Sequence, residues 1–240
     1  MKKNSKLENA IELFSSDLKL LFGNNLVSII LTGSAASGKF NSKFSDINFL
    51  VILSESGIGK IGGVRKYLKK WASKRISLPL FLTEEYVNES LDTFPIEFFN
   101  MKSGYRLIMG SDILKKLDFE KDKMRLQCER ELKGKLLQLR QGYISTKGAK
   151  RALERLIRES IVSFTSIFRA LLFLKGEDVP SSRDEILEKA CDSFDLDTEI
   201  FIALSQIREG SLKLSGSELD LLVADYIAEI AQISEIVDKM

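Results

Sequence analysis

Apolar residues in the first half of the chain gather in short runs of strand length. The first two runs, Leu26–Leu31 and Ile47–Leu53, are almost uninterrupted, which is typical of strands that are buried on both faces of a sheet. Before them, Leu7–Leu21 repeats apolar side chains at helical spacing, and Gly23 ends that pattern. The pattern therefore predicts a helix followed by two strands of one sheet.

Shorter apolar segments continue this alternation to about residue 118. Val64–Lys74 keeps its apolar residues on one side, which predicts a short helix. Glu84–Ser90 is predicted to be another helix, because Thr83 before it is a suitable N-cap and its first residues are acidic. Three segments have the apolar content of further strands: Ile76–Leu82, Pro95–Asn100 and the beginning of Tyr105–Leu117.

From about residue 118 onward the strand-like runs disappear and only helical spacing remains. The clearest case is Lys147–Lys175, whose apolar side chains form a wide stripe suited to the core of a bundle. The other predicted helices are Lys121–Tyr143, Ser182–Phe194, Thr198–Glu209 and Ser217–Lys239. The expected fold class is α+β, with a small mixed sheet and flanking helices in residues 1–120 and an all-α helical bundle domain in residues 121–240.

The residue types that are missing restrict the chemistry. The 240 residues include no histidine, which excludes a Ser-His-Asp triad, a histidine acid–base pair and most zinc sites. The two cysteines, Cys128 and Cys191, fall in predicted helices and are expected to be buried thiols. Catalysis therefore requires carboxylates, amines, guanidinium groups, hydroxyls or a bound ion.

The sequence predicts neither a membrane span nor a signal peptide. No uninterrupted apolar run reaches the roughly 18–20 residues of a transmembrane helix. The first residues include two lysines, but no apolar segment of signal-peptide length and no small-residue cleavage site. We therefore expect a cytoplasmic protein without a membrane partner.

One segment is strongly basic, although the formal net charge of the chain is only +2. Residues Lys60–Arg75 contain seven lysines and arginines and no acid. Two interpretations are open. The segment can be a solvated face beside a core stripe, or it can contact phosphate or nucleic acid, because local charge acts even where the net charge is small.

The candidate chemistry lies around the connection between the first two predicted strands. A Gly33-Ser34 turn follows the first run, and Asp46 stands at the mouth of the second. Backbone N–H groups of a small-residue turn can hold phosphate oxygens, and a carboxylate at a strand end can hold the Mg²⁺ that accompanies them. Asn48 is expected on the same face as Asp46, because side chains repeat every two residues along a strand.

A third candidate is Glu97, the lone acid in the apolar segment PIEFFN. An acid among the apolar residues of a strand is costly to bury without a partner. A salt bridge with a lysine is one way in which Glu97 can gain such a partner.

The spacing of these residues resembles the signature of a known family. Gly33-Ser34, eleven residues and then Asp46-Ile47-Asn48 in an apolar strand resemble the DNA polymerase β-like nucleotidyltransferases, which include kanamycin nucleotidyltransferase and the minimal nucleotidyltransferases. The resemblance covers roughly residues 10–117. It implies a nucleotidyltransferase-like fold and Mg²⁺-dependent transfer of a nucleoside monophosphate from a nucleoside triphosphate to an unknown acceptor. It also implies that Asp46, Asn48 and Glu97 form the catalytic, metal-binding set and that Gly33 and Ser34 hold the nucleotide.

The chain departs from this signature at Asn48, where the family has a second carboxylate. A neutral amide removes one negative charge and a bridging ligand, so a site with one Mg²⁺ ion rather than two is expected. Two interpretations follow. One is an active enzyme with unusual metal dependence, and the other is a catalytically lapsed relative that binds nucleotide or acts as a protein-interaction module.

The resemblance also bears on partners. In the resembling antibiotic-modifying enzymes a helical domain builds the acceptor site and often a dimer interface, which makes a homodimer one expectation here. The alternative is that the bundle only stabilises the fold. Nucleic acid remains a further candidate partner because of the segment Lys60–Arg75.

Overall fold

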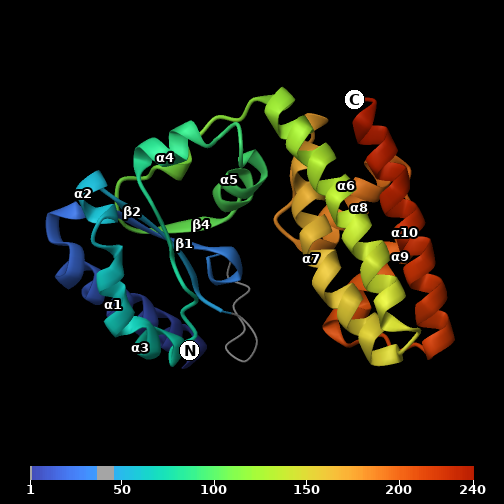
Figure 1. Ribbon diagram of the computed structural model, residues 1–240, viewed down its shortest axis with the longest axis horizontal. Coiled ribbons are helices and arrows are strands. Elements are labelled where there is room, and N and C mark those ends of the chain that lie inside the picture. Colours follow the sequence, from blue (N-terminus) through green and yellow to red (C-terminus); the bar gives the residue numbers. More distant parts are fainter. Residues whose placement is uncertain (1, 37–45) are drawn as a thin grey trace. The chain divides into compact units, whose positions relative to one another are not determined.

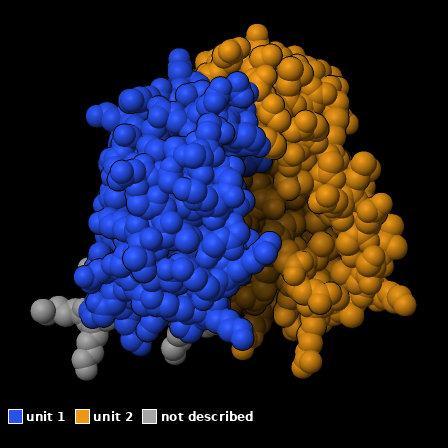
Figure 2. Space-filling model, turned by 60° about the vertical axis from the view of Figure 1, so that its left-hand side comes forward, with its two compact units in different colours: residues 1–91, 97–118 blue, residues 92–96, 119–240 orange. Residues whose placement is uncertain are grey.

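The computed structural model describes residues 2–36 and 46–240. The chain divides into two compact units, of which unit 1 comprises residues 1–91 and 97–118 and unit 2 comprises residues 92–96 and 119–240 (Figure 2). The sheet lies in unit 1, and unit 2 is helical.

Unit 1 is built on a mixed sheet of four strands in the order β3-β2-β1-β4 (Figure 1). The central strands, β1 (Leu26–Thr32) and β2 (Asn48–Leu53), pair antiparallel. At one edge β4 (Tyr105–Gly110) pairs antiparallel with β1, and at the other edge the short β3 (Leu80–Leu82) pairs parallel with β2. The small mixed sheet predicted from the sequence is therefore confirmed.

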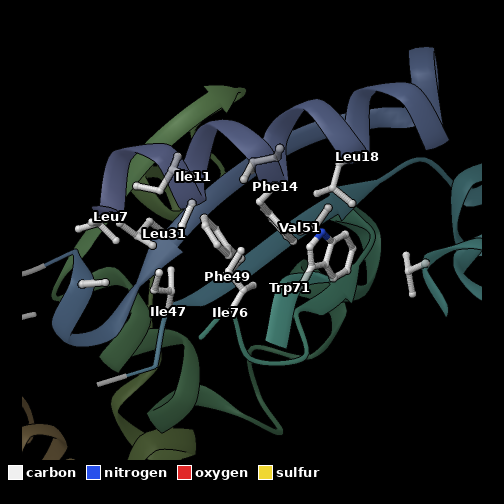
Figure 3. Packing of buried hydrophobic residues seen from close by; sticks show 14 of the residues in the cluster. Leu7, Ile11, Phe14, Leu18, Leu31, Ile47, Phe49, Val51, Trp71 and Ile76 are labelled. Atoms are coloured by element: carbon white, nitrogen blue, oxygen red, sulfur yellow. The ribbon is translucent and has the colours of Figure 1, made fainter. Parts of the chain in front are cut away.

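The main core of unit 1 lies between the sheet and helix α1 (Lys2–Phe22). The Phe14 ring stacks on Phe49 with ring centroids 4.1 Å apart, and it meets Trp71 edge-on at 4.8 Å (Figure 3). Apolar side chains of α1 that recur at helical spacing are buried against the sheet: Leu7, Ile11, Phe14, Leu18 and Phe22. The amphipathic pattern of the sequence thus gives the helix that covers one face of the sheet.

The opposite face of the sheet is buried as well. Ile29 and Leu31 of β1 belong to the core under α1, whereas Ile30, which alternates with them, is also fully buried. Helices α4 (Glu84–Glu89) and α5 (Pro95–Lys102) lie on the side of the sheet away from α1 (Figure 1). This two-sided burial explains why the central strands are nearly continuous apolar runs in the sequence.

The segment between β2 and β3 is helical but irregular. The short helix α2 (Glu55–Ile58) begins at an N-cap formed by Ser54, and a 3₁₀ helix, η3 (Ile61–Tyr67), leads into α3 (Leu68–Ala72). Three further 3₁₀ turns lie elsewhere in unit 1: η1 (Gly23–Asn25), η2 (Gly33–Ala35) and η4 (Leu114–Lys116). The helix predicted at Val64–Lys74 is therefore divided between a 3₁₀ and an α-helical part.

Two strand predictions need correction. The predicted strand Pro95–Asn100 is wrong, because these residues begin helix α5. Proline suits the first turn of a helix, and the Ile96 N–H is bound by the side-chain oxygen of Gln127 at 2.8 Å. Within the described residues, the predicted strand Ile76–Leu82 forms sheet pairs at two places, an isolated bridge at Ile76 and the short strand β3. Pro79 between them has no N–H to donate.

Unit 2 is a bundle of helices, as the sequence predicts. They are α6 (Lys121–Thr146), α7 (Lys150–Leu174), α8 (Arg183–Phe194), α9 (Thr198–Glu209) and α10 (Gly216–Asp238). Aromatic rings from three helices meet in its interior, where Phe201 lies 5.4 Å from Phe168 and 5.9 Å from Tyr226. Among the residues described, no helix combines the length and the apolar character that crossing a bilayer requires.

Candidate functional site

The predicted phosphate-holding turn and the predicted metal-binding residues meet at one end of the central strands. In the antiparallel register Thr32, the last residue of β1, pairs with Asn48, the first residue of β2. A Cβ atom added to Gly33 would lie 3.3 Å from Nδ2 of Asn48. The structure therefore brings Gly33 next to Asn48, with Asp46 two residues away along the same chain.

Gly33 has a backbone conformation that suits a close approach to a ligand. Its φ of +70° lies in the left-handed region, which favours glycine because it has no Cβ. The carbonyl of Gly33 accepts a hydrogen bond of 3.0 Å from the Ala36 N–H and closes the turn η2. The chain thus turns away sharply from the end of β1 at the position where the resemblance places the triphosphate.

Asp46 and Asn48 are both exposed, whereas Ile47 between them is buried. This alternation is the one expected when two side chains two residues apart share a face of a strand. Ile47 is tied to the neighbouring chain segment by a parallel bridge to Ile76. The polar pair therefore projects from a backbone that is anchored on its buried side.

Asp46 forms an ion pair with Arg75 that the sequence did not indicate. The Arg75 Nη2 lies 3.3 Å from Asp46 Oδ1, and both side chains are more than a third exposed, at 39% and 62%. A screened pair of this kind contributes about 1 kcal/mol or less. It is weak enough for an incoming phosphate or cation to displace.

The Arg75 backbone is itself unusual. Its φ of +61° is left-handed, a conformation that an arginine seldom adopts. The Arg75 carbonyl accepts a hydrogen bond of 2.8 Å from the Ile47 N–H, which joins this residue to the start of β2. Backbone strain of this kind is often found at functional sites, so Arg75 joins the candidate site residues.

Asn48 is held by Ser77, a residue that sequence analysis missed. The Ser77 hydroxyl lies 2.6 Å from Asn48 Oδ1, and the Ser77 N–H donates to the Ile47 carbonyl at 3.1 Å. The amide oxygen has two lone pairs, so one remains for a cation or another donor. Arg75 belongs to the basic segment Lys60–Arg75, for which phosphate contact was one interpretation, whereas the only sequence signal for Ser77 was its place beside Ile76 at the start of an apolar run.

The third ligand was expected on a strand beside β2, but Glu97 does not lie on a strand. It lies on helix α5, where its side chain is exposed. The segments that neighbour the start of β2 are Leu26–Thr32 and Ile76–Leu82, and neither contains an acid. Its assignment to a metal site therefore stays a prediction.

A tyrosine–carboxylate pair lies one strand away. Tyr105, which pairs with Thr32 in the sheet, donates its hydroxyl to Asp112, whose two oxygens lie 2.8 and 3.0 Å away. Burial, and then the hydrogen bond and the negative charge of Asp112, raise the pKa of Tyr105 to about 12. Tyr105 therefore remains a hydrogen-bond donor at neutral pH.

The donor set at this end of the sheet suits one hard cation that is already bound to phosphate. Within the described ranges, no group of three or more aspartate, glutamate, cysteine or histidine side chains could hold a metal ion. Mg²⁺ commonly binds through one or two carboxylates and completes its coordination with water and substrate phosphates. The Asp46 carboxylate and the Asn48 amide oxygen fit that limited role, but they do not fit two ions that share carboxylate bridges.

The described helices of unit 2 enclose cavities. One, of about 350 Å³, lies between α8 and α9, and its wall includes Asp184, Glu188 and Glu209. Another, of about 370 Å³, lies between α6 and α7 and includes Ser160 and Phe164. Both have the volume of a small-molecule pocket.

Comparison with known proteins gives a match in structure. No protein-family model matches the sequence, and no curated protein matches it in a sequence search. The chain is similar in structure to a spectinomycin adenyltransferase, AAD(9) from Enterococcus faecialis, solved with ATP and spectinomycin. The TM-score is 0.57 at 13% sequence identity, and the match covers 93% of this chain and 99% of the adenyltransferase chain.

The two chains share a fold. The adenyltransferase fold confirms the nucleotidyltransferase-like fold class that the spacing of Gly33-Ser34 and Asp46 suggested. At this identity the likeness extends to the fold alone, and it does not single out the kanamycin nucleotidyltransferase group.

Proposed function

We propose that the chain binds a nucleoside triphosphate at the end of β1 and β2 and transfers the nucleoside monophosphate group to an acceptor. The observation that carries this proposal is the meeting of the Gly33 turn with Asp46 and Asn48 at the paired ends of two buried strands. The fold shared with an enzyme solved with ATP supports it.

Each residue at this end of the sheet has a proposed part. Gly33 and Ser34 offer backbone N–H groups to the phosphate oxygens, and the φ of +70° at Gly33 lets the nucleotide approach closely. Arg75 offers a guanidinium group, which binds phosphate more strongly than it binds a single exposed carboxylate. Asp46 and Asn48 would hold one Mg²⁺, which neutralises charge on the pyrophosphate leaving group.

Glu97 is kept as the second proposed carboxylate. Its exposed position on α5 leaves it accessible to an acceptor, and a carboxylate can accept the proton that the attacking hydroxyl loses. In the proposed reaction the acceptor oxygen attacks the α-phosphorus, and pyrophosphate leaves.

A second candidate function is nucleotide binding without transfer. Two observations favour it: the Asn48 amide is bound by Ser77, and the Asp46 carboxylate is paired with a cation. A site with a single acid beside an arginine has less capacity to bind metal ions than one with two or three acids.

Nucleotide binding is the first test. ATP affinity is measured by calorimetry with and without Mg²⁺ in wild type, in Asp46→Asn and in the control Asp122→Asn, an exposed aspartate on α6. We expect Asp46→Asn to weaken Mg²⁺-dependent binding by about tenfold or more, which corresponds to at least about 1.4 kcal/mol. The control should bind as wild type does. An affinity that neither Mg²⁺ nor Asp46→Asn changes would exclude this site.

Transfer is tested with pyrophosphate release from ATP and a panel of acceptors that includes water and spectinomycin. If wild type transfers and Asn48→Ala abolishes the activity, the amide is a working ligand. If only Asn48→Asp transfers, the protein is a nucleotide binder that has lost catalysis. Glu97→Gln should lower transfer but not ATP affinity, and Glu55→Gln, another exposed carboxylate in unit 1, should change neither.

A further inference from the structure

Apart from Arg75, the proposed nucleotide site does not use the positive charge concentrated between Lys60 and Arg75. Between Glu55 and Glu84 the chain has seven basic residues and no acid. The remainder has 29 basic and 34 acidic residues, a net charge of −5. A local positive region therefore stands on a chain that is otherwise slightly acidic.

Most of this charge is exposed and is not neutralised by the protein. We name as the basic face the five exposed residues of η3, α3 and their flanks that form no ion pair within the described part of the chain: Lys60, Arg65, Lys66, Lys69 and Lys74. The other two basic residues are paired, Lys70 with Asp17 and Arg75 with Asp46. The basic face thus keeps about five uncompensated positive charges.

The backbone beneath these side chains is anchored firmly. Val64 and Trp71 are buried in the core under α1, and the Trp71 Nε1–H donates to Asp17 at 3.0 Å. Tyr67 stacks on Trp71 with ring centroids 5.6 Å apart, and the Lys66 ammonium lies 4.9 Å from the Tyr67 ring. The charges therefore project from a fixed platform, so a ligand does not have to order the backbone to use them.

The spacing of the charges suits a line of phosphates. Lys66 and Lys69 are three residues apart across the junction of η3 with α3, a spacing that places side chains on the same side of both a 3₁₀ and an α-helix. Lys74 follows the end of α3 and is next in sequence to Arg75, the arginine that pairs with Asp46.

We propose that the basic face binds the phosphodiester backbone of a single-stranded nucleic acid. A flexible strand carries one negative charge per nucleotide and can adapt to the positions of separate lysine and arginine side chains. An anionic membrane is disfavoured because the large apolar side chains exposed on η3 and α3, Ile61 and Leu68, are only 40% and 37% exposed, which provides little apolar surface for insertion. Binding of this kind does not depend on the proposed transfer reaction.

The test uses the full chain and a fluorescein-labelled single-stranded RNA of mixed sequence, followed by anisotropy over a salt series. The test variant is Lys66→Glu with Lys69→Glu and Lys74→Glu, which leaves the Lys70–Asp17 and Arg75–Asp46 pairs in place. The matched control reverses three exposed arginines of unit 2: Arg130, Arg140 and Arg151. Replacing the same three lysines by arginine keeps the charge.

We expect wild type to bind with a strong salt dependence. The triple reversal should weaken binding at low salt at least tenfold and reduce the slope of log K against log salt by about 2, because a single-stranded contact contributes about 0.7 to that slope. The arginine replacements and the unit 2 control should stay within about twofold of wild type. Retained Trp71 fluorescence in the triple reversal shows that unit 1 is folded, because Trp71 is the single tryptophan of the chain.

Three outcomes would overturn the proposal. The first is RNA binding that the unit 2 control weakens as much as the triple reversal does. The second is an unchanged salt slope in the triple reversal. The third is binding to vesicles that contain phosphatidylserine, without binding to RNA. Single-stranded DNA of the same sequence is included to show whether the 2′-hydroxyl contributes, since the proposal rests on phosphate contacts.

Discussion

At the residue scale, Gly33 links backbone conformation to the candidate site. An alanine there would have to adopt a φ of +70°, and its Cβ would lie 3.3 Å from Nδ2 of Asn48. We predict that Gly33→Ala costs about 1–2 kcal/mol of stability because of the left-handed backbone. It should also lower ATP affinity, because it moves the Asn48 amide and fills the space beside the turn. Urea unfolding and calorimetry measure the two effects.

Gly23 provides the control for that substitution. It also has positive φ, at +52°, but nothing lies within 4 Å of a Cβ added to it. Gly23→Ala should lose similar stability and keep the ATP affinity of wild type. Equal loss of affinity in both variants would mean that backbone strain, rather than the contact with Asn48, controls binding.

Tyr105 gives a prediction about pH. Its pKa is raised to about 12 by burial and by Asp112. Because the folded-state pKa lies above the ordinary value of 10, the contribution of this group to stability is present below pH 10 and is lost as the pH rises toward 12. The difference in phenolate absorbance between wild type and Tyr105→Phe should therefore titrate near pH 12.

Asp112→Asn separates the causes of that shift. The substitution removes the negative charge but not the burial, so the pKa of Tyr105 should fall toward 10 without reaching it. A Tyr105 titration near pH 10 in wild type would contradict the hydrogen bonds of 2.8 and 3.0 Å to Asp112.

At the scale of the elements, the sequence predicts those whose signals are local. Helix α1 follows from the helical spacing of its apolar residues. Strands β1 and β2 follow from nearly uninterrupted apolar runs of six residues or more. The segment that contains Glu97 shows the limit. Ile96 and Phe98 are buried and Glu97 between them is exposed, so six residues match a strand as well as a helix. Pro95 at the helix start was the signal that distinguishes them.

One buried carboxylate, Asp17, links α1 to α3 by hydrogen bonds. Asp17 accepts hydrogen bonds from Lys70 at 2.7 Å and from the Trp71 Nε1–H at 3.0 Å. We predict that Asp17→Ala lowers the free energy of unfolding by about 1–3 kcal/mol, because it leaves the buried Trp71 N–H without an acceptor. Unfolding in urea, followed by Trp71 fluorescence, measures the loss.

Two variants show whether the hydrogen bond is the cause. Asp17→Asn keeps an oxygen acceptor for Trp71 and should lose less stability than Asp17→Ala. Glu12→Ala removes an exposed carboxylate from the same helix and should cost little. If Glu12→Ala and Asp17→Ala are equally destabilising, the contact between α1 and α3 does not carry the stability assigned to it.

At the scale of the whole molecule, long-range pairing limits what the sequence can reveal about the site. The spacing of Gly33 and Asp46 indicated that two strand ends meet, because one connection joins them. Arg75 and Ser77 reach the same place through a parallel bridge between Ile47 and Ile76, which no local pattern encodes. The partners of the two site residues, Arg75 for Asp46 and Ser77 for Asn48, therefore emerged only from the structure.

The division into two units leads to the last prediction, that the predicted domains 1–120 and 121–240 unfold separately. The chain carries its own reporters. Trp71 is the single tryptophan and lies in unit 1, whereas both cysteines, Cys128 and Cys191, are buried in unit 2. Tryptophan fluorescence and thiol reactivity along a urea series therefore follow the two units independently.

A large-to-small substitution in each core completes this test. Phe14 in unit 1 and Phe168 in unit 2 are fully buried, and replacing either by alanine should cost about 3–5 kcal/mol in its own unit. Phe14→Ala should shift the fluorescence midpoint and leave thiol protection unchanged, and Phe168→Ala should do the reverse. A single transition seen by both probes, shifted equally by both variants, would show that the chain unfolds as one cooperative domain.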